Sequence, residues 1–95
     1  MASFTEFTCF LMRSAMKKID RYLSFQLEEY GISVPQSFIL FALLEEDGST
    51  LKEIGTKAQI DSSSMTVLVD KLENERFLER KLDSQDRRAI MVFLT

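Results

Sequence analysis

The side chains of this chain that could do chemistry are few, and their types favour binding over catalysis. The sequence has no histidine, so its one cysteine, Cys9, has no imidazole that could activate it as a nucleophile. Zinc sites built from histidine and cysteine are excluded for the same reason. We therefore expect no catalytic residue, no metal site, no cofactor and no enzyme activity.

Two clusters of polar residues remain as candidates for binding. The first is a set of short hydroxyl side chains directly after Asp61, formed by Ser62, Ser63, Ser64 and Thr66. The second is the run Asp83-Ser84-Gln85-Asp86-Arg87-Arg88, which separates two short segments of alternating apolar residues. Such a run is either a solvated turn or a charged tip that reaches an anion.

Composition limits what can position these clusters. Ninety-five residues, 45% of them hydrophobic, suit one small globular domain. The net charge of −3 argues mildly against nucleic acid. Residues 50–95, however, hold eight basic and eight acidic side chains, and five of the bases gather between Arg76 and Arg88, so a local positive patch is expected. The longest mainly apolar run, 34–44, is far shorter than the ~20 residues of a membrane span, and no secretory leader is visible. We expect a cytoplasmic protein.

Hydrophobic periodicity predicts four helices. A long helix over residues 5–30 ends at Gly31, and a second, apolar around most of its circumference and therefore buried, runs from Ser33 to Gly48. Thr50-Leu51-Lys52-Glu53 is a capping box that begins a short third helix, with Leu51, Ile54, Gly55 and Ala58 expected to be buried. The fourth reaches about Glu75, with its N-cap among Asp61 and the three serines. Two helices joined by three residues suggest a helix-turn-helix.

The fourth helix has one apolar side and one side of small residues. Its core stripe is Met65, Leu68, Val69 and Leu72, at positions i, i+3, i+4 and i+7. The opposite side carries Ser63, Val67, Asp70 and Asn74, flanked by Thr66 and Lys71. A solvated helix would normally carry longer charged side chains there, whereas short ones let a helix enter the major groove of DNA.

Two alternating runs, 78–82 and 89–94, pair as a hairpin around the charged tip. Helices followed by such a hairpin are typical of a winged helix, in which the last helix lies in the major groove and the hairpin at the backbone or minor groove. The predicted fold is therefore mainly α with a small β-hairpin: a winged helix-turn-helix at residues 31–95 and a long helical segment at 1–30. The charged tip is then the wing.

Four stretches in order resemble the MarR family of transcription regulators. They are Gly31-Ile32-Ser33-Val34-Pro35-Gln36, Leu51-Lys52-Glu53-Ile54, "DSSSMTVLVDKLE" from Asp61, and "DRRAIMVFLT" from Asp86, which is similar to the family's D-x-R wing signature. The resemblance implies a sequence-specific regulator of transcription, in the first instance a repressor. The alternative is a winged helix that binds protein and no nucleic acid.

The resemblance also implies roles for individual residues. Ser62, Ser63, Ser64 and Thr66 would contact phosphates and base edges at the start of the recognition helix, for which hydroxyls and helix N-terminal amides are suited. Lys71, Lys52 and Lys57 would contact the DNA backbone, although each could equally be a solvated lysine. Arg88 would enter the minor groove, oriented by Asp86, and Arg87 would meet a phosphate.

Three features depart from the family pattern. Val67 stands where many members carry a basic residue, although a valine can still touch a thymine methyl group. Arg76 stands where a glycine usually ends the recognition helix, at a position that favours positive φ. The two C-terminal helices that usually complete the dimer and the ligand pocket are absent, so the sequence is either a fragment or a short variant.

The apolar start of the first helix predicts assembly. Phe4, Phe7, Phe10 and Leu11 form more apolar surface than one small domain can cover, so we expect a homodimer and a pseudo-palindromic operator. The resemblance also leaves room for a small aromatic effector. Peroxide-sensing members place a reactive cysteine in this helix, but Cys9 lacks the tyrosines that accompany such thiols, and we expect it to be a small buried hydrophobe.

Overall fold

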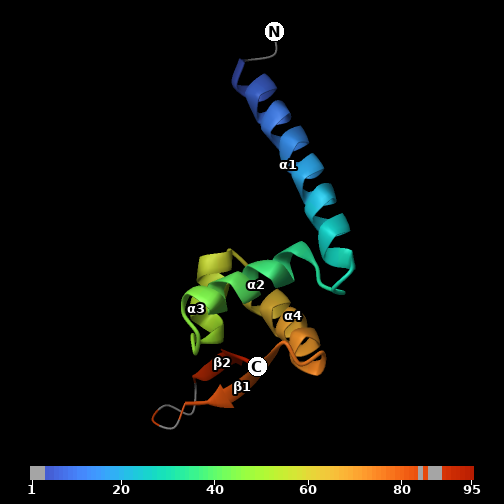
Figure 1. Ribbon diagram of the computed structural model, residues 1–95. Coiled ribbons are helices and arrows are strands. Elements are labelled where there is room, and N and C mark those ends of the chain that lie inside the picture. The colour runs from blue at the N-terminus through green and yellow to red at the C-terminus, as the bar shows by residue number, and fades with distance from the viewer. Residues whose placement is uncertain (1–3, 84, 86–88) are drawn as a thin grey trace. The chain divides into compact units, whose positions relative to one another are not determined.

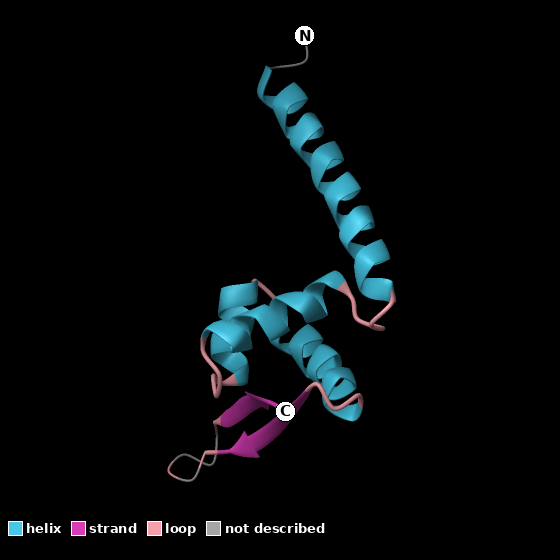
Figure 2. Cartoon of the chain, in the orientation of Figure 1, coloured by secondary structure: helices cyan, strands magenta, loops and turns pink. Residues whose placement is uncertain are grey.

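The structure is a computed structural model that describes residues 4–83, 85 and 89–95, with the backbone alone for 4–6. Its helices are α1 (Phe4–Glu28), α2 (Val34–Glu45), α3 (Leu51–Ala58) and α4 (Ser62–Asn74). Strands β1 (Leu78–Leu82) and β2 (Ile90–Leu94) follow as an antiparallel hairpin (Figure 1, Figure 2). This order confirms the predicted winged helix-turn-helix with a long N-terminal helix.

The chain divides into two compact units, Met1–Val34 and Pro35–Thr95. The first unit consists of α1 and the turn after it, where Gly31 has a φ of 72° and donates its backbone N–H to the Glu28 carbonyl. The predicted stop at Gly31 is thus confirmed, although α1 itself ends at Glu28. The predicted domain division between residues 30 and 31 stays a prediction.

In the first unit, no second layer packs on α1 among the described residues. The side chains of Phe7, Phe10 and Leu11 are therefore exposed, by 58%, 65% and 50%. The prediction that Cys9 is buried is wrong for the single chain, since its side chain is also exposed. The side chain of Phe4 lies outside the described residues.

The second unit is built around one apolar core to which every element contributes. Ile39 and Leu43 of α2, Ile54 of α3, Val69 and Leu72 of α4, Leu78 of β1 and Val92 of β2 are all at most 1% exposed. The predicted core stripe of α4 is therefore confirmed at Met65, Val69 and Leu72, with Leu68 half-buried. On α3 only Ile54 and Gly55 are fully buried, whereas Leu51 and Ala58 are half-buried.

Helix α2 differs from its prediction in length and in burial. It ends at Glu45, not at Gly48. Only the side facing the core is buried, and Phe38, Phe41 and Leu44 are 45%, 66% and 71% exposed. An apolar circumference indicates that a helix can be covered on all sides, but within the second unit α3, α4 and the wing cover only one side of α2.

The loop between α2 and α3 attaches the hairpin to the helices. The backbone N–H of Gly48 donates to the Val92 carbonyl at 2.9 Å, and the Val92 N–H donates to the Ser49 carbonyl at 2.9 Å. A carboxylate oxygen of Asp47 accepts from the Leu94 N–H at 2.8 Å. Gly48 has a φ of 81°, and a Cβ there would lie 3.0 Å from the Phe93 ring. This loop therefore fixes β2 beside the start of α3.

Candidate nucleic-acid interface

The turn between α3 and α4 is held by a close approach of two backbones. Gln59 adopts the left-handed conformation at φ 59°, and the Ile60 N–H donates to the Gly55 carbonyl at 2.9 Å. A Cβ on Gly55 would lie 3.0 Å from the Ile60 carbonyl oxygen and 3.2 Å from Cγ of Met65. Because glycine lacks that atom, α3 can pack tightly against α4, which sets the angle of the helix-turn-helix.

Both helices of this motif begin with side-chain caps. Thr50 and Glu53 form the predicted capping box, with each side chain accepting from the backbone N–H of the other residue at 3.1 Å. On α4 the N-cap is Asp61, whose Oδ1 accepts from the Ser64 N–H at 2.8 Å. The prediction that the cap lies among Asp61 and the serines is confirmed, and the cap is the aspartate.

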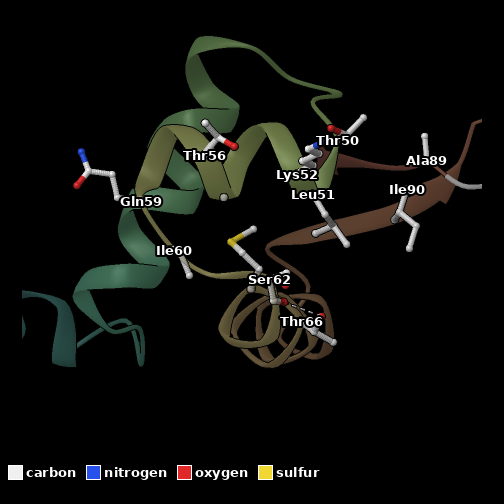
Figure 3. A pocket seen from close by; sticks show the side chains of 12 residues that line it. Thr50, Leu51, Lys52, Thr56, Gln59, Ile60, Ser62, Thr66, Ala89 and Ile90 are labelled. Atoms are coloured by element: carbon white, nitrogen blue, oxygen red, sulfur yellow. Dashed lines mark hydrogen bonds between the residues drawn. The ribbon is translucent and has the colours of Figure 1, made fainter.

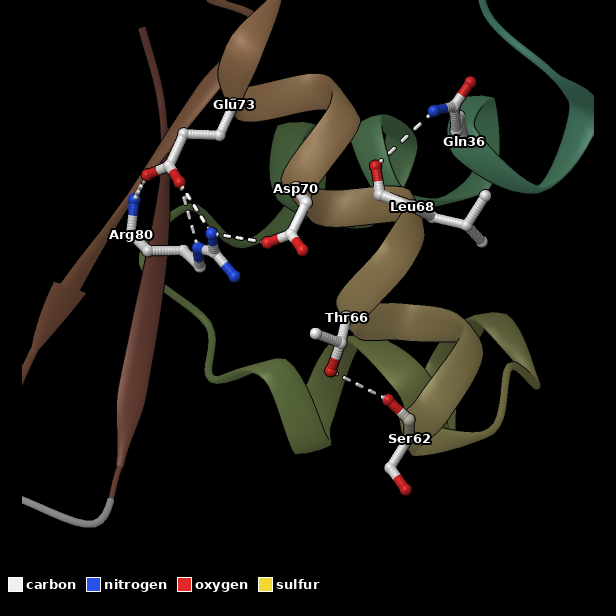
Figure 4. Close-up of polar contacts among 7 residues, drawn as sticks. All are labelled: Gln36, Ser62, Thr66, Leu68, Asp70, Glu73 and Arg80. Carbon is white, nitrogen blue, oxygen red and sulfur yellow. Dashed lines mark hydrogen bonds and ion pairs between the residues drawn. The ribbon is translucent and has the colours of Figure 1, made fainter.

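Three of the four hydroxyls predicted to contact DNA, those of Ser63, Ser64 and Thr66, donate hydrogen bonds at the start of α4. Ser63 Oγ donates to Asp61 Oδ1 at 2.7 Å, and Ser64 Oγ donates to Asp61 Oδ2 at 3.1 Å. The Ser64 backbone N–H and these two hydroxyls hold the pKa of Asp61 below its ordinary value of 3.8. Thr66 Oγ1 donates to the Ser62 carbonyl at 3.1 Å (Figure 4). Each hydroxyl oxygen can still accept, which suits the amino groups of adenine and cytosine in the major groove.

The outward side of α4 is small and exposed, as its sequence predicts. Val67 is 68% exposed in the middle of this side. Ser62, Ser63 and Thr66 are also exposed, and Lys71 is exposed in the last turn. Long side chains therefore do not block the approach of a duplex to the first two turns of α4.

A groove of about 850 Å³ lies between α3, the start of α4 and the end of the wing (Figure 3). Its polar lining residues come from both helices of the motif: Thr50, Lys52, Thr56, Gln59, Ser62 and Thr66. Ala89 and Ile90 close it on the side of β2. The groove thus brings Ser62, Thr66 and Lys52 together, as expected for one continuous binding face.

The structure separates Lys57 from this face. Lys57 Nζ lies 2.8 Å from Oε2 of Glu45, and the lysine lines a smaller hollow with Phe38 and Phe41 of α2. Both partners of the ion pair are well exposed, so the pair contributes at most ~1 kcal/mol to stability and is easily opened. The role of Lys57 as a backbone contact stays a prediction.

The expected positive patch is reduced by ion pairs in the wing. Arg80 binds Asp70 and Glu73 of α4, and Lys81 Nζ lies 3.3 Å from Oε1 of Glu79. The tip residues Asp86, Arg87 and Arg88 lie outside the described residues. Arg80, which is held by two carboxylates, therefore offers little free positive charge to a ligand, whereas the exposed pair of Lys81 is easily opened.

Sequence reasoning missed two groups at this interface. Thr56 and Gln59 line the groove, and their signal was an unbroken polar side on α3. The bridge from Arg80 to Asp70 and Glu73 was also missed. Its signal was a pair of carboxylates at i and i+3 followed seven residues later by an arginine, which come into contact only because β1 packs beside α4.

A helix-turn-helix whose second helix exposes small side chains beside a two-stranded wing defines a winged-helix protein. The model of the MarR family matches residues 32–90, and the chain belongs to the MarR family.

Relatives and solved structures agree with this assignment. The chain is 33% identical over 87 residues to the HTH-type transcriptional regulator TtmR of Methylorubrum extorquens, covering 92% of this chain and 45% of that protein. It is 30% identical to the regulator SarZ of Staphylococcus epidermidis, covering 92% of this chain and 59% of that protein. The chain thus spans about half the length of these curated relatives.

Among solved structures, reduced AbfR bound to DNA superimposes with a TM-score of 0.90 at 25% identity, covering 96% of this chain and 64% of that one. A MarR transcriptional regulator from Methanosarcina mazei gives a TM-score of 0.85 at 30% identity, covering 95% of this chain and 65% of that one. Within the part of our chain that the structure describes, no helix is both long enough and apolar enough to span a membrane.

Proposed function

We propose that this chain is a sequence-specific regulator of transcription that binds double-stranded DNA, with α4 in the major groove and the wing at the minor groove. The observation that carries the proposal is the exposed, short-side-chain face of α4 beside the groove shared with α3 and β2. The structure of a relative that is similar along nearly the whole of this chain has been solved with DNA bound.

The proposed contacts follow from position. Ser62, Ser63, Ser64, Thr66 and Val67 would meet base edges and the nearest phosphates, while Lys52 and Lys71 would contact the backbone on either side. At the wing, Asp86 would orient Arg88 in the minor groove and Arg87 would meet a phosphate, an assignment that rests on the sequence alone.

In the simplest case such a protein represses transcription by covering a promoter, and it works in the cytoplasm, where bacterial and archaeal DNA lies.

Fluorescence anisotropy with a mixed-sequence duplex at two salt concentrations tests the proposal. Each phosphate that the protein neutralises releases counterions, so the logarithm of the binding constant should fall with the logarithm of the salt concentration, by about 0.9 per contact. Several contacts predict a steep fall. An affinity that does not change with salt, or no binding at low salt, would contradict the proposal.

A second candidate is a winged helix that binds another protein. It is favoured by the exposed apolar side of α2 and by the net charge of −3. Under this alternative, substitutions at Phe41 or Leu44 would abolish partner binding, and substitutions on α4 would not.

A further inference from the structure

Arg80, in the middle of β1, is bound to two carboxylates of α4 (Figure 4). Its Nη2 lies 2.6 Å from Oδ1 of Asp70 and 2.8 Å from Oε1 of Glu73, and its Nε donates to the same Glu73 oxygen at 3.1 Å. The backbone N–H of Arg80 donates to Oε2 of Glu73 at 2.9 Å. One guanidinium therefore binds two acidic side chains. The hydrogen bond from the Arg80 backbone to Glu73 does not depend on the guanidinium.

The guanidinium is a neutralising group at this position and not a free cation. The arginine side chain is 27% exposed, less than either carboxylate. The hydrogen bonds from the Arg80 backbone and side chain lower the pKa of Glu73, and the hydrogen bond to Glu73 raises the pKa of Arg80. Glu73 and Arg80 are therefore charged near neutral pH, and two carboxylates with one guanidinium give the cluster a formal net charge of −1.

The two carboxylates lie on the same stripe of α4 as Thr66. Thr66, Asp70 and Glu73 occupy positions i, i+4 and i+7, so they succeed one another along one side of the helix. At 1.5 Å per residue, Asp70 lies about 6 Å along the axis from Thr66. Because Thr66 lines the groove beside α3, a duplex that contacts Thr66 passes close to Asp70.

We propose that Arg80 is a positioning residue for DNA binding, which neutralises Asp70 and Glu73 where α4 meets the duplex and does not itself contact a phosphate. The inference rests on the proposed function. Without Arg80, two carboxylates would face the phosphate backbone with no cation between them, and like charges brought together oppose binding. With Arg80 in place, the side of α4 that carries these two acidic residues can still lie in the major groove of DNA.

A charge-matched pair of variants separates this role from a direct contact. Arg80→Gln changes the net charge of the cluster from −1 to −2, whereas Arg80→Gln combined with Asp70→Asn restores it to −1 without restoring the arginine. Arg80→Gln should weaken binding of a mixed-sequence duplex about 5- to 10-fold at low salt, the effect of one added charge within several ångströms of a phosphate. The loss should shrink at higher salt because the repulsion is screened. The double variant should bind within about 2-fold of wild type on the same grounds.

Two further variants serve as controls, each measured by anisotropy and checked for folding by thermal melting. Arg80→Lys keeps the positive charge and should bind like wild type. Lys81→Gln removes the same charge from the neighbouring residue, which points to the other face of the hairpin and pairs with Glu79, and it should cost at most about 2-fold. The backbone bond to Glu73 remains in every variant, so each is expected to fold.

Provided that the wild type binds DNA, any of four results would overturn the inference. The first is that Arg80→Gln binds like wild type, and the second is that the double variant binds as weakly as Arg80→Gln. The third is that Arg80→Lys binds as weakly as Arg80→Gln, and the fourth is that Lys81→Gln loses as much affinity as Arg80→Gln. The second would indicate that Arg80 contacts the duplex or acts only by placing the wing. Failure of the wild-type chain to bind any duplex would instead refute the proposed function, and the inference with it.

Discussion

At the scale of single residues, the hydroxyls of three short side chains in the candidate interface, Ser63, Ser64 and Thr66, already donate hydrogen bonds within the protein. Asp61 accepts from the Ser64 amide and from two serine hydroxyls, and Thr66 donates within its own helix. The hydroxyl cluster could be predicted from the sequence as the start of the fourth helix. Its internal bonding could not, because serine hydroxyls after an aspartate can turn either to the cap or to a ligand. The face that α4 offers to DNA is therefore chiefly one of acceptors and one exposed valine.

The cap predicts a pH dependence of stability. The pKa of Asp61 is lowered by its hydrogen bonds, so its folded-state pKa lies below the unfolded value near 3.8. Its contribution to the free energy of unfolding is therefore present in full above that value and is lost as pH falls through the folded-state pKa. We expect Asp61→Ala to melt at a lower temperature than wild type at pH 7, with a smaller difference at pH 2–3.

Asp61→Asn is the matched control, since asparagine caps a helix but does not titrate in this range. It should lie between the wild type and Asp61→Ala at pH 7. Thermal melting followed by circular dichroism gives the comparison. A gap between wild type and Asp61→Ala that widens on acidification would contradict the assigned cap.

Arg76 is the second residue whose conformation makes a prediction. Its φ is 66°, in the region that favours glycine, as its place after the recognition helix predicts. Arg76→Gly should relieve the Cβ crowding and raise the free energy of unfolding by about 1 kcal/mol, while Arg76→Ala, which keeps the Cβ, should change it little. Urea denaturation measures both, and equal effects of the two substitutions would show that the backbone is not strained there.

At the scale of elements, periodicity and capping predicted the order and nature of all six helices and strands. The predictions of the capping box at Thr50 and of the apolar stripe of α4 are confirmed because both features depend on residues close together in the sequence. The exposure of Phe38, Phe41 and Leu44 could not be predicted, since a helix that is apolar all round does not reveal which sides find a partner. The contact of Arg80 with α4 also could not be predicted, since it depends on how β1 packs beside α4.

The close packing of α3 on α4 predicts a strict requirement at Gly55. Gly55→Val would place side-chain atoms against the Ile60 carbonyl and Met65, and it should lower the free energy of unfolding by about 1–3 kcal/mol. The neighbouring Thr56 is exposed, so Thr56→Val introduces a similar side chain without that clash and should have little effect. Chemical denaturation of both proteins is the measurement, and a Gly55→Val protein as stable as wild type would show that the turn can adjust.

At the scale of the whole molecule, α1 presents an apolar surface that no described residue of its own unit covers. Phe7, Phe10 and Leu11 are at least half exposed in the single chain. Large side chains of this kind each gain ~1.5–3 kcal/mol when they are fully buried. We propose that a second copy of the chain covers them, which would also place two copies of α4 about one DNA turn, ~34 Å, apart on a pseudo-palindromic operator.

Sedimentation equilibrium at micromolar concentration tests this assembly. The wild-type chain should sediment as a dimer, and a variant with both Phe7→Glu and Phe10→Glu should sediment as a monomer, because buried carboxylates would oppose association. Circular dichroism of the variant checks that the helices persist. A wild-type chain that remains a soluble monomer at high concentration would contradict the proposed dimer.

The central claim, that the exposed face of α4 is the surface that meets DNA, is tested most directly by one pair of substitutions. Val67 on α4 and Leu44 on α2 are both exposed aliphatic residues, by 68% and 71%, and each can be replaced by glutamate without entering the core. Val67→Glu puts a negative charge against the duplex and should weaken binding at least about 10-fold, whereas Leu44→Glu, with the same change in net charge, should stay within about 2-fold of wild type. Equal losses for the two variants, or a Val67→Glu protein that binds a mixed-sequence duplex like wild type, would contradict the account.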